Sequence, residues 1–249
     1  MTTPILKVTG LAKAFDGVRA VDGVTFEVAA GELVALIGPN GAGKTTCFNL
    51  VNGQLKPDAG EIVLAGQHIE GESPQAIAVR GVGRTFQVAA TFASMTVREN
   101  VVLALLAHAG KHGAMFSGTP TEFDEQANAL LARVGCLELA DTHCATLAYG
   151  NAKRVELALA LAGEPKLLLM DEPTAGMAQN SRGKLMRLAS ALTKSDRIAV
   201  VFTEHDMDVV FGFADRVIVL DRGRIIAQGT PDVIRADPRV QAVYLGEEA

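Results

Sequence analysis

Gly38-Pro39-Asn40-Gly41-Ala42-Gly43-Lys44-Thr45 is the stretch that decides the fold class of this 249-residue chain. It matches in full the pattern of a phosphate-binding loop, a glycine-rich turn that ends in a lysine and a hydroxyl residue. Directly before it, Glu32 to Ile37 is a near-continuous apolar run, which is typical of a buried strand. A buried strand, a phosphate loop and the start of a helix, in that order, predict a nucleotide-binding α/β fold.

The parts of this loop suit the binding of ATP and Mg²⁺. Its glycines let backbone N–H groups turn inward around the β-phosphate, and the N-terminus of the following helix adds a favourable dipole. Lys44 is expected to reach the β- and γ-phosphates, and Thr45 to ligate Mg²⁺ through its hydroxyl. A chance glycine-rich turn before a lysine is the alternative, and the flanking strand and helix argue against it. The expected ATP-binding residues of this segment are Gly38, Pro39, Asn40, Gly41, Ala42, Gly43, Lys44, Thr45 and Thr46.

A second apolar run, Leu167 to Met170, ends in the carboxylates of Asp171 and Glu172. Adjacent acids at the end of a strand are often solvated loop charges. Here a phosphate loop needs a carboxylate to hold its magnesium ion, and a buried strand positions one rigidly. We therefore expect Asp171 to lie beside the metal, with Glu172 facing the γ-phosphate as the general base that polarises the attacking water.

Further runs predict a mostly parallel sheet with helices on both faces, the core of a P-loop NTPase. The predicted strands are 21–28, 61–64, 166–170, 198–202, 216–220 and 224–227. From about Gln87 to Ala160 the pattern becomes helical, with a capping box formed by Thr96 and Glu99 and a second helix that opens at Thr121. The sequence thus predicts a single α/β domain with an inserted α-helical subdomain: a core with an antiparallel β portion at 1–86 and 161–235, the subdomain at 87–160, and a C-terminal tail at 236–249.

The composition bounds the partners of the chain. A net charge of −5 supplies no broad positive field for a phosphate backbone, so nucleic acid is not an expected partner. The three cysteines, Cys47, Cys136 and Cys144, lack metal-ligand spacing and indicate reduced thiols in a cytoplasmic protein. The apolar runs are all shorter than the roughly 20 residues that span a bilayer. Any membrane-spanning part of a transport system is therefore expected on other chains.

Five motifs occur in an order that resembles an ATP-binding cassette protein, over nearly the whole chain. They are the phosphate loop, Gly83-Arg84-Thr85-Phe86-Gln87, Leu147-Ala148-Tyr149-Gly150-Asn151, Asp171-Glu172-Pro173-Thr174 and Thr203-Glu204-His205-Asp206. The resemblance implies that Gln87 senses Mg²⁺ and the γ-phosphate, and that His205 contacts the γ-phosphate. Glu172, His205 and Gln87 are then the expected catalytic residues, with Thr45, Gln87 and Asp171 around the metal.

The same resemblance implies two further contacts with ATP. Phe15 stands where such cassettes carry the aromatic side chain that stacks on adenine, although an aromatic residue in a first strand is more often part of a core. The segment Ala148, Tyr149, Gly150 and Asn151 resembles the signature motif, which contacts in trans the γ-phosphate held by the opposite subunit. It departs from the usual pattern, because Ala148 replaces a serine and Asn151 a glutamine. After Pro173, the run from Thr174 to Met177 lacks the aspartate of many relatives.

With these departures the chain resembles the ATP-binding subunits of high-affinity branched-chain amino-acid importers. Glu204 to Met207 and the C-terminal Val243 to Glu247 support the same resemblance. The resemblance implies a second ATPase subunit in a homo- or heterodimer, transmembrane permease subunits, a substrate-binding protein, and a place on the cytoplasmic face of the membrane. Urea, amides, other amino acids or exported lipids remain open as cargo. The alternatives are a lipid- or drug-export cassette and a non-transport cassette; a phosphate-loop kinase leaves the signature-like segment and His205 unexplained.

Overall fold

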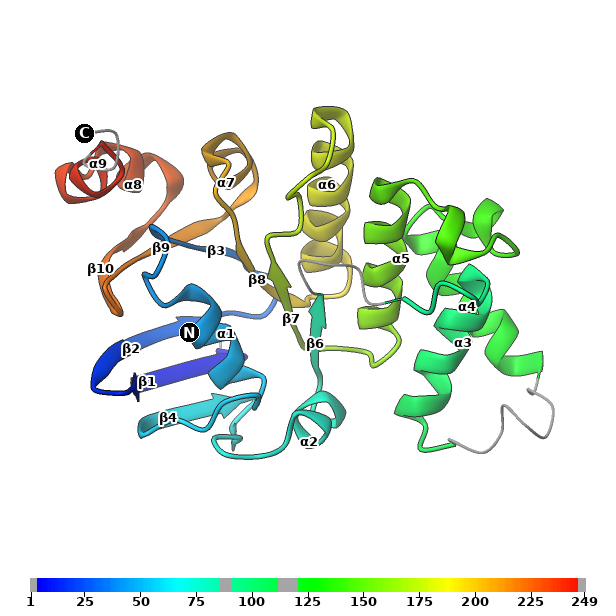
Figure 1. Cartoon of the computed structure of the whole chain (residues 1–249), viewed down its shortest axis with the longest axis horizontal. Helices are drawn as coiled ribbons and strands as arrows, with labels where there is room; N and C mark the ends of the chain where they lie inside the picture. Colours follow the sequence, from blue (N-terminus) through cyan, green and yellow to red (C-terminus); the bar gives the residue numbers. More distant parts are fainter. Residues whose placement is uncertain (1–3, 86–90, 112–120, 246–249) are drawn as a thin grey trace.

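The computed structural model describes residues 4–85, 91–111 and 121–245. Its centre is a six-stranded sheet in the order β10-β9-β3-β8-β7-β6, in which only β10 runs antiparallel to its neighbour (Figure 1). These strands are β3 (Leu33–Ile37), β6 (Val82–Thr85), β7 (Leu167–Asp171), β8 (Ala199–Thr203), β9 (Arg216–Asp221) and β10 (Arg224–Gly229). The predicted mostly parallel sheet is confirmed.

Strand β3 explains why this sheet lies in the middle of the molecule. All five of its residues are buried, and alternate side chains enter two different hydrophobic clusters. Leu33, Ala35 and Ile37 pack on the side of the large helices, whereas Val34 and Leu36 pack on the opposite side. A strand that is buried on both faces has an unbroken run of apolar residues, and this run is the pattern that predicts β3 from the sequence.

A second, antiparallel sheet covers one face of the first. Its order is β2-β1-β4-β5, with β1 (Leu6–Phe15), β2 (Val18–Val28), β4 (Ala59–Leu64) and β5 (Gln67–His68). Helix α1 (Lys44–Val51) lies between the two sheets (Figure 1), and its Phe48 and Leu50 share a cluster with Leu6 and Val8 of β1. The helix that follows the phosphate loop is therefore packed on both sides.

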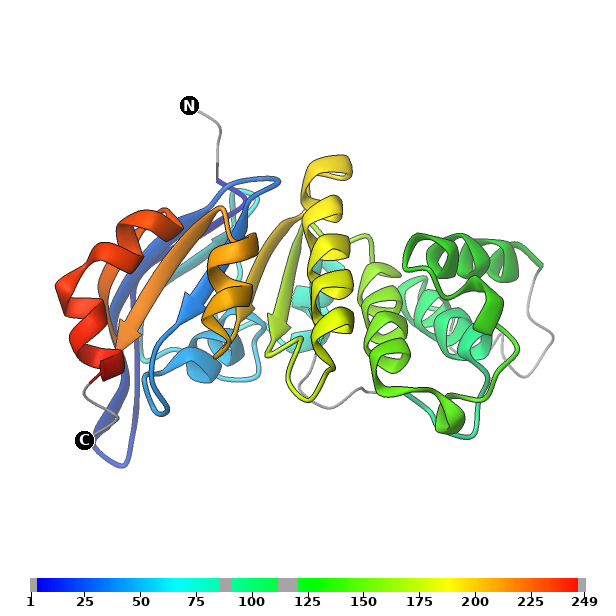
Figure 2. The same cartoon turned by 90° about the horizontal axis from the view of Figure 1, so that it is seen from above.

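The described part of the range predicted to form a helical subdomain contains the α-helices α3 (Val97–His108), α4 (Thr121–Arg133) and α5 (Tyr149–Leu161). The predicted capping box is confirmed: the Thr96 hydroxyl accepts from the Glu99 N–H at 3.2 Å, and the Glu99 carboxylate accepts from the Thr96 N–H at 2.7 Å. Phe123, Leu130 and Leu131 form the buried face of α4. These helices gather at one end of the molecule, away from α1 and the antiparallel sheet (Figures 1 and 2).

The remaining helices lie around the core. They are α2 (Pro74–Val79), α6 (Gln179–Ser195), α7 (Met207–Phe213), α8 (Pro231–Ala236) and α9 (Pro238–Leu245), with short 3₁₀ turns η2 (Leu137–Leu139) and η3 (Cys144–Thr146). Helices α8 and α9 pack against β10, so the segment predicted to be a C-terminal tail contains a docked helix. No helix among the described residues is long and apolar enough to cross a membrane.

Candidate functional site

The phosphate loop turns tightly between β3 and α1, and two of its glycines are required by close backbone contacts. A Cβ atom at Gly38 would lie 2.2 Å from the Leu220 carbonyl oxygen, and one at Gly43 would lie 2.3 Å from the Ala20 carbonyl oxygen. Gly43 also has φ 103° and serves as the N-cap of α1, so no side chain caps this helix. The first N–H groups of α1 are thus presented by the loop itself.

Lys44 is the first residue of α1 and is buried. Its ammonium donates to the carbonyl oxygens of Gly38 at 2.6 Å and Pro39 at 3.1 Å. The charge is thereby held inside the loop, at the place where the phosphates are expected. Thr45 follows on the exposed side of the first turn and Thr46 is half-buried beside it.

Asp171 is the last residue of strand β7 and Glu172 follows it directly, so both acids lie at the strand end as predicted; Thr203 of β8 links them. The Thr203 hydroxyl donates to Asp171 Oδ1 at 2.8 Å, and the Glu172 N–H donates to the Thr203 hydroxyl oxygen at 3.0 Å. The other carboxylate oxygen of Asp171 accepts from the guanidinium of Arg84 at 3.2 Å. The orientation of Asp171 is therefore determined by residues of two neighbouring strands.

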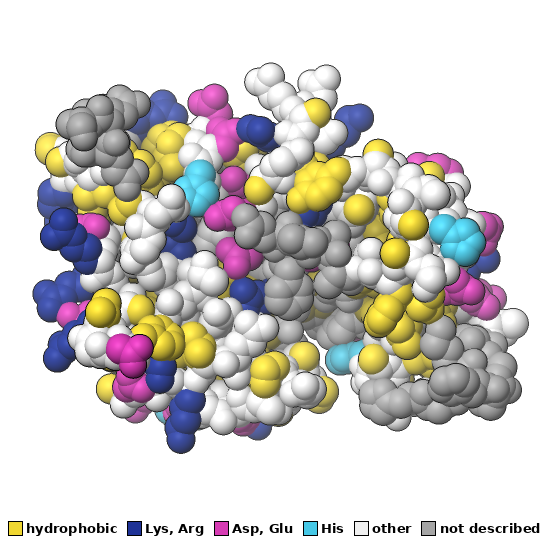
Figure 3. All heavy atoms as spheres, viewed as in Figure 1, with side chains coloured by type: hydrophobic (Ala, Val, Ile, Leu, Met, Phe, Trp, Pro, Cys, Tyr) yellow, Lys and Arg dark blue, Asp and Glu magenta, His cyan; other side chains and the backbone are white. Residues whose placement is uncertain are grey.

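Glu172 and His205 meet although 33 residues separate them. His205 Nε2 lies 3.0 Å from Glu172 Oε1, and Glu172 has φ 46°, in the left-handed region that residues with side chains rarely adopt. Acidic side chains gather beside a histidine near the middle of this face of the molecule (Figure 3). The structure brings together two of the three predicted catalytic residues; the third, Gln87, lies outside the described residues.

Residues that sequence reasoning did not assign hold the loop after Glu172 in place. The buried carboxylate of Glu204 accepts from the Thr174 N–H at 2.8 Å and from its hydroxyl at 2.6 Å. Arg182 of α6 donates to the Met177 carbonyl oxygen at 2.8 Å and pairs with Asp206 at 2.6 Å. The acidic residues on either side of His205, Glu204 and Asp206, are visible in the sequence as candidates for such bonds. Their partners are not, because Thr174 and Arg182 lie 30 and 24 positions away in the chain.

Phe15 ends strand β1 and pairs with Val18 of β2. The residue is 43% exposed, and the Lys13 ammonium lies 5.7 Å from the centroid of its ring. The sequence left two expectations for Phe15, adenine stacking or a place in the core. Its exposure agrees with the first, because an exposed residue leaves a face of the ring open for stacking. Ala20, two residues beyond Val18, is the residue whose carbonyl oxygen approaches Gly43, so this hairpin borders the phosphate loop.

The signature-like segment forms the start of α5. Ala148 is the N-cap and provides no side-chain hydrogen bond. A Cβ at Gly176, in the loop after Glu172, would touch the Tyr149 ring at 3.5 Å, so these two segments lie side by side. The Asn151 amide oxygen accepts from Arg154 at 2.6 Å, and Arg154 donates in turn to the Gly135 carbonyl oxygen at 2.6 Å. Arg154 thereby ties the signature-like segment to the residues that follow α4.

The protein's share of a magnesium site is small. No group of three or more His, Cys, Asp or Glu side chains gathers to hold a metal within residues 4–85, 91–111 and 121–245. Thr45 and Asp171 are oxygen donors, which Mg²⁺ prefers, and this ion usually completes its shell with substrate phosphates and water. The residues present therefore fit Mg²⁺ that arrives with a nucleotide.

Comparisons with known proteins agree with this geometry. The family model described as "ABC transporter" matches residues 21–175, and the model "Branched-chain amino acid ATP-binding cassette transporter" matches residues 224–249. The chain is 42% identical to the high-affinity branched-chain amino acid transport ATP-binding protein LivG of Escherichia coli, over 99% of this chain and 100% of LivG. It is 38% identical to BraF of Pseudomonas aeruginosa over 99% and 100%, and 35% identical to the lipopolysaccharide export protein LptB of E. coli over 98% of both.

Solved structures show the same fold. A nucleotide-free ATP-binding cassette from an ABC transporter superposes with a TM-score of 0.87 at 30% identity, covering 97% of this chain and 99% of that one. A dimeric cassette bound to ADP and phosphate after hydrolysis gives 0.77 at 26% identity, covering 91% and 98%. The phosphate loop, the paired acids on β7 and the full-length similarity lead to one conclusion: the chain belongs to the ATP-binding subunits of ABC transporters, a family of ATP-hydrolysing cassettes.

Proposed function

We propose that this chain hydrolyses ATP at the site described above and thereby powers the uptake of branched-chain or related amino acids. The similarity over the full length to LivG and BraF carries the choice of cargo. The match of residues 224–249 to the branched-chain amino acid cassette model supports it independently of the phosphate loop.

In this proposal the phosphate loop binds the triphosphate. The Lys44 ammonium leaves the carbonyl oxygens of Gly38 and Pro39 and pairs with phosphate oxygens, which exchanges weak neutral acceptors for charged ones. Phe15 stacks on the adenine. Thr45 and Asp171 hold Mg²⁺, with Gln87 as a further residue near it; when bound, the ion neutralises the charge of the phosphates.

Glu172 is the general base. Its carboxylate accepts a proton from the attacking water, and its left-handed backbone and N–H bond to Thr203 hold it in one orientation. His205 at 3.0 Å bonds to the same carboxylate and so orients it towards the γ-phosphate. The single observation that supports these roles best is this Glu172–His205 contact at the ends of β7 and β8, beside the phosphate loop.

A second ATPase subunit completes each site. The start of α5, with Ala148, Tyr149, Gly150 and Asn151, contacts the γ-phosphate bound by the partner through backbone N–H groups, since Ala148 has no hydroxyl. The dimeric cassette bound to ADP and phosphate, which shares this fold, supports an arrangement of two subunits. The partner is either an identical chain or a related one.

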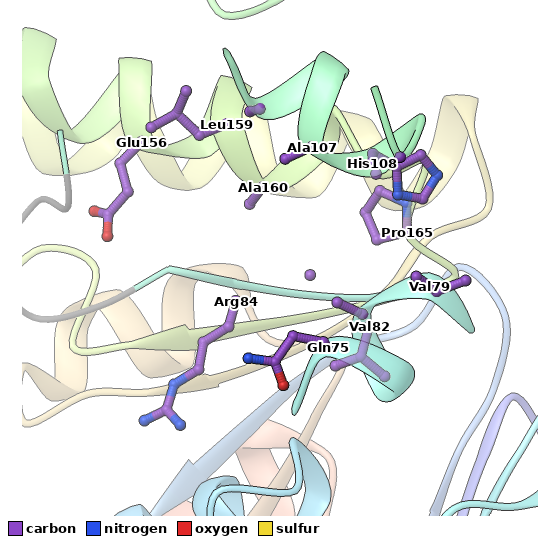
Figure 4. A pocket seen from close by; sticks show the side chains of 15 residues that line it. Gln75, Val79, Val82, Arg84, Ala107, His108, Glu156, Leu159, Ala160 and Pro165 are labelled. Carbon is purple, nitrogen blue, oxygen red and sulfur yellow. The ribbon is translucent and has the colours of Figure 1, made fainter. Parts of the chain in front are cut away.

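The membrane subunit docks in the groove between the α/β core and the helices. This groove of about 650 Å³ has one wall from α3 and α5, with Ala107 and Leu159, and another from α2 and β6, with Val79 and Val82 (Figure 4). Its lining is mainly apolar, and Val79 is 70% exposed. A short amphipathic helix from a permease subunit fits such a lining. In this proposal the chain lies on the cytoplasmic face of the membrane, opposite the substrate-binding protein.

Uptake of labelled leucine by cells that lack the gene tests this function. Uptake at submicromolar leucine should fall and return with a plasmid-borne copy, but not with a Glu172→Gln copy. The similarity to LptB makes lipid export the second candidate. Unchanged uptake together with accumulation of lipid at the inner membrane would favour export and contradict the proposed cargo.

A further inference from the structure

An arginine with a largely buried side chain connects the strands and the helix that surround the proposed magnesium position. Arg84 lies on β6, and its guanidinium points away from the wall of the groove formed by α3 and α5 (Figure 4). Its side chain is only 9% exposed. Burial lowers the pKa of this guanidinium, and the negative charge of Asp171 raises it. A cation in this position is stable only with a nearby counter-charge.

The guanidinium bonds to two structural elements at once. Nη2 donates to Asp171 Oδ2 at 3.2 Å at the end of β7, while Nη1 donates to the Asn49 side-chain oxygen of α1 at 2.7 Å. Nη1 also lies 3.1 Å from the Gln54 side-chain oxygen, just after α1. Asn49 stands four residues after Thr45, one helical turn along α1. Arg84 thus spans the distance between the helix that carries Thr45 and the carboxylate of Asp171.

We propose that Arg84 is a positioning residue for Mg²⁺, which fixes the separation between Thr45 on α1 and Asp171 on β7. The inference rests on the proposed function, because it takes these two residues as the protein's ligands of the ion. Only a planar fork with several donors reaches both partners together, so lysine is not an equivalent substitute. The bonds from Arg84 and Thr203 orient Asp171 without exhausting its acceptor capacity, since each oxygen has two lone pairs.

The affinity for ADP, measured by isothermal titration in Mg²⁺ and again in EDTA, gives the readout. The affinity in Mg²⁺ divided by the affinity in EDTA reports how much the ion contributes to ADP binding. ADP is not hydrolysed, so the measurement does not depend on catalysis. Arg84→Gln should lower this ratio by about tenfold, the scale on which partners of metal ligands affect metal affinity. The affinity in EDTA should stay within about twofold of wild type, because Lys44 and the loop amides do not depend on Arg84.

Two further variants separate bridging from charge. Asn49→Leu leaves the pair of Arg84 with Asp171 intact and removes its bond to α1, so the ratio should fall in the same direction. Arg80→Gln is the matched control: Arg80 also forms a forked pair, with Glu72 at 2.6 Å through both Nε and Nη2. Its Nη1 donates to Gln67 of β5 at 2.7 Å, on the other sheet from β7. The ratio of Arg80→Gln should equal that of wild type.

Each outcome decides a different claim. A wild-type ratio of one would refute the proposed magnesium site, and the inference would fall with it. Given a wild-type ratio above one, an unchanged or raised ratio in Arg84→Gln would overturn the inference; a raised ratio would mean that Arg84 competes with the ion. A fall in Arg84→Gln without a fall in Asn49→Leu would also overturn it, because charge alone would then suffice. If Arg84→Gln does not fold by circular dichroism, Asn49→Leu decides.

Discussion

Two helix starts in this protein are proposed to contact phosphate, and they are built in different ways. Helix α1 begins after a loop whose close backbone contacts require glycine at Gly38 and Gly43, with the Lys44 ammonium already inside the loop. Helix α5 begins at Ala148, which has no side-chain cap, and its neighbouring Asn151 is held by Arg154. The first start has a cation inside its own loop, whereas at the second the Arg154 guanidinium is bonded to Asn151 and to the Gly135 carbonyl oxygen.

In the proposed dimer the two helix starts therefore contribute to ATP binding in different ways. A site with its own cation binds nucleotide without a partner, because charge-assisted hydrogen bonds are about twice as strong as neutral ones. In the proposed dimer, a helix start whose N-cap residue, Ala148, offers neither a charge nor a hydroxyl adds to the binding of a phosphate that the first site already holds. Variants of the two helix starts should therefore affect different measurements.

Loss of the cation in α1 should have the largest effect. Lys44→Ala should abolish detectable ATP binding in isothermal titration, because the phosphates lose the ammonium that faces them. Lys7→Ala is the matched control, since Lys7 pairs with Glu27 on the exposed antiparallel sheet at 3.4 Å. Unchanged ATP affinity in a folded Lys44→Ala protein would show that the loop amides alone hold the nucleotide.

A hydroxyl added at α5 should make the second helix start more like a complete phosphate contact. A hydrogen bond to a charged oxygen contributes roughly 1.5 to 3 kcal/mol, so Ala148→Ser should raise ATP-dependent dimerisation and basal hydrolysis by about 10- to 150-fold. Steady-state rates at several protein concentrations measure this.

Ala148→Gly is the control for this change, because glycine also favours the N-cap position but carries no hydroxyl. If serine and glycine raise the rate equally, the gain comes from capping of α5. Activity of the serine variant at or below that of wild type would show that backbone donors alone determine the contact.

Removal of the exposed ring near α1 should affect adenine and not phosphate. Phe15→Ala should weaken ATP binding by about 1 to 2 kcal/mol, a scale given by the stacking of bases on aromatic side chains, or about 5- to 30-fold in affinity. Phe15→Tyr keeps the flat ring and should change little. Pyrophosphate affinity should be equal in all three proteins; equal ATP affinity in the alanine variant would remove Phe15 from the site.

The smallest effect is expected from the tie that holds α5. Asn151→Ala removes the acceptor of Arg154 at 2.6 Å and should cost about 1 kcal/mol of stability, or about 2 to 4 °C in the midpoint of thermal unfolding. It should also weaken ATP-dependent dimerisation. Asn128→Ala is the control, because Asn128 accepts from Arg98 at 3.1 Å within the same group of helices. Equal loss of dimerisation in both variants would argue against a specific role for the start of α5.

Local patterns account for what the sequence predicts well. The phosphate loop, β3 and the acids that end β7 are each readable within eight residues, because a buried strand and a glycine turn leave direct compositional signals. The antiparallel sheet is only partly predicted: β5 is absent from the predicted strands, and β1 is anticipated only by the placement of Phe15 in a first strand, without bounds. Strand β1 mixes buried and exposed positions irregularly, with bulges around Leu11 that break the alternation.

Contacts between distant residues are the part that the sequence does not reveal. Arg84 and Asp171 are 87 positions apart, and nothing in either neighbourhood indicates the other. The same holds for Glu204, whose burial beneath Thr174 depends on how β8 and the loop after β7 pack together. His205 and Glu172 receive their roles from the order of motifs, and the structure adds that their side chains meet at 3.0 Å.

The state of association of Glu172→Gln with Mg·ATP tests the central claim most directly. This variant keeps the phosphate loop and Lys44 but lacks the proposed base, so it should bind ATP, fail to turn it over and accumulate as a closed dimer. Light scattering after size-exclusion chromatography should give twice the 26.1 kDa mass of one chain with Mg·ATP, and a single mass without nucleotide. A Glu172→Gln protein that stays monomeric and hydrolyses ATP at the wild-type rate would contradict the account.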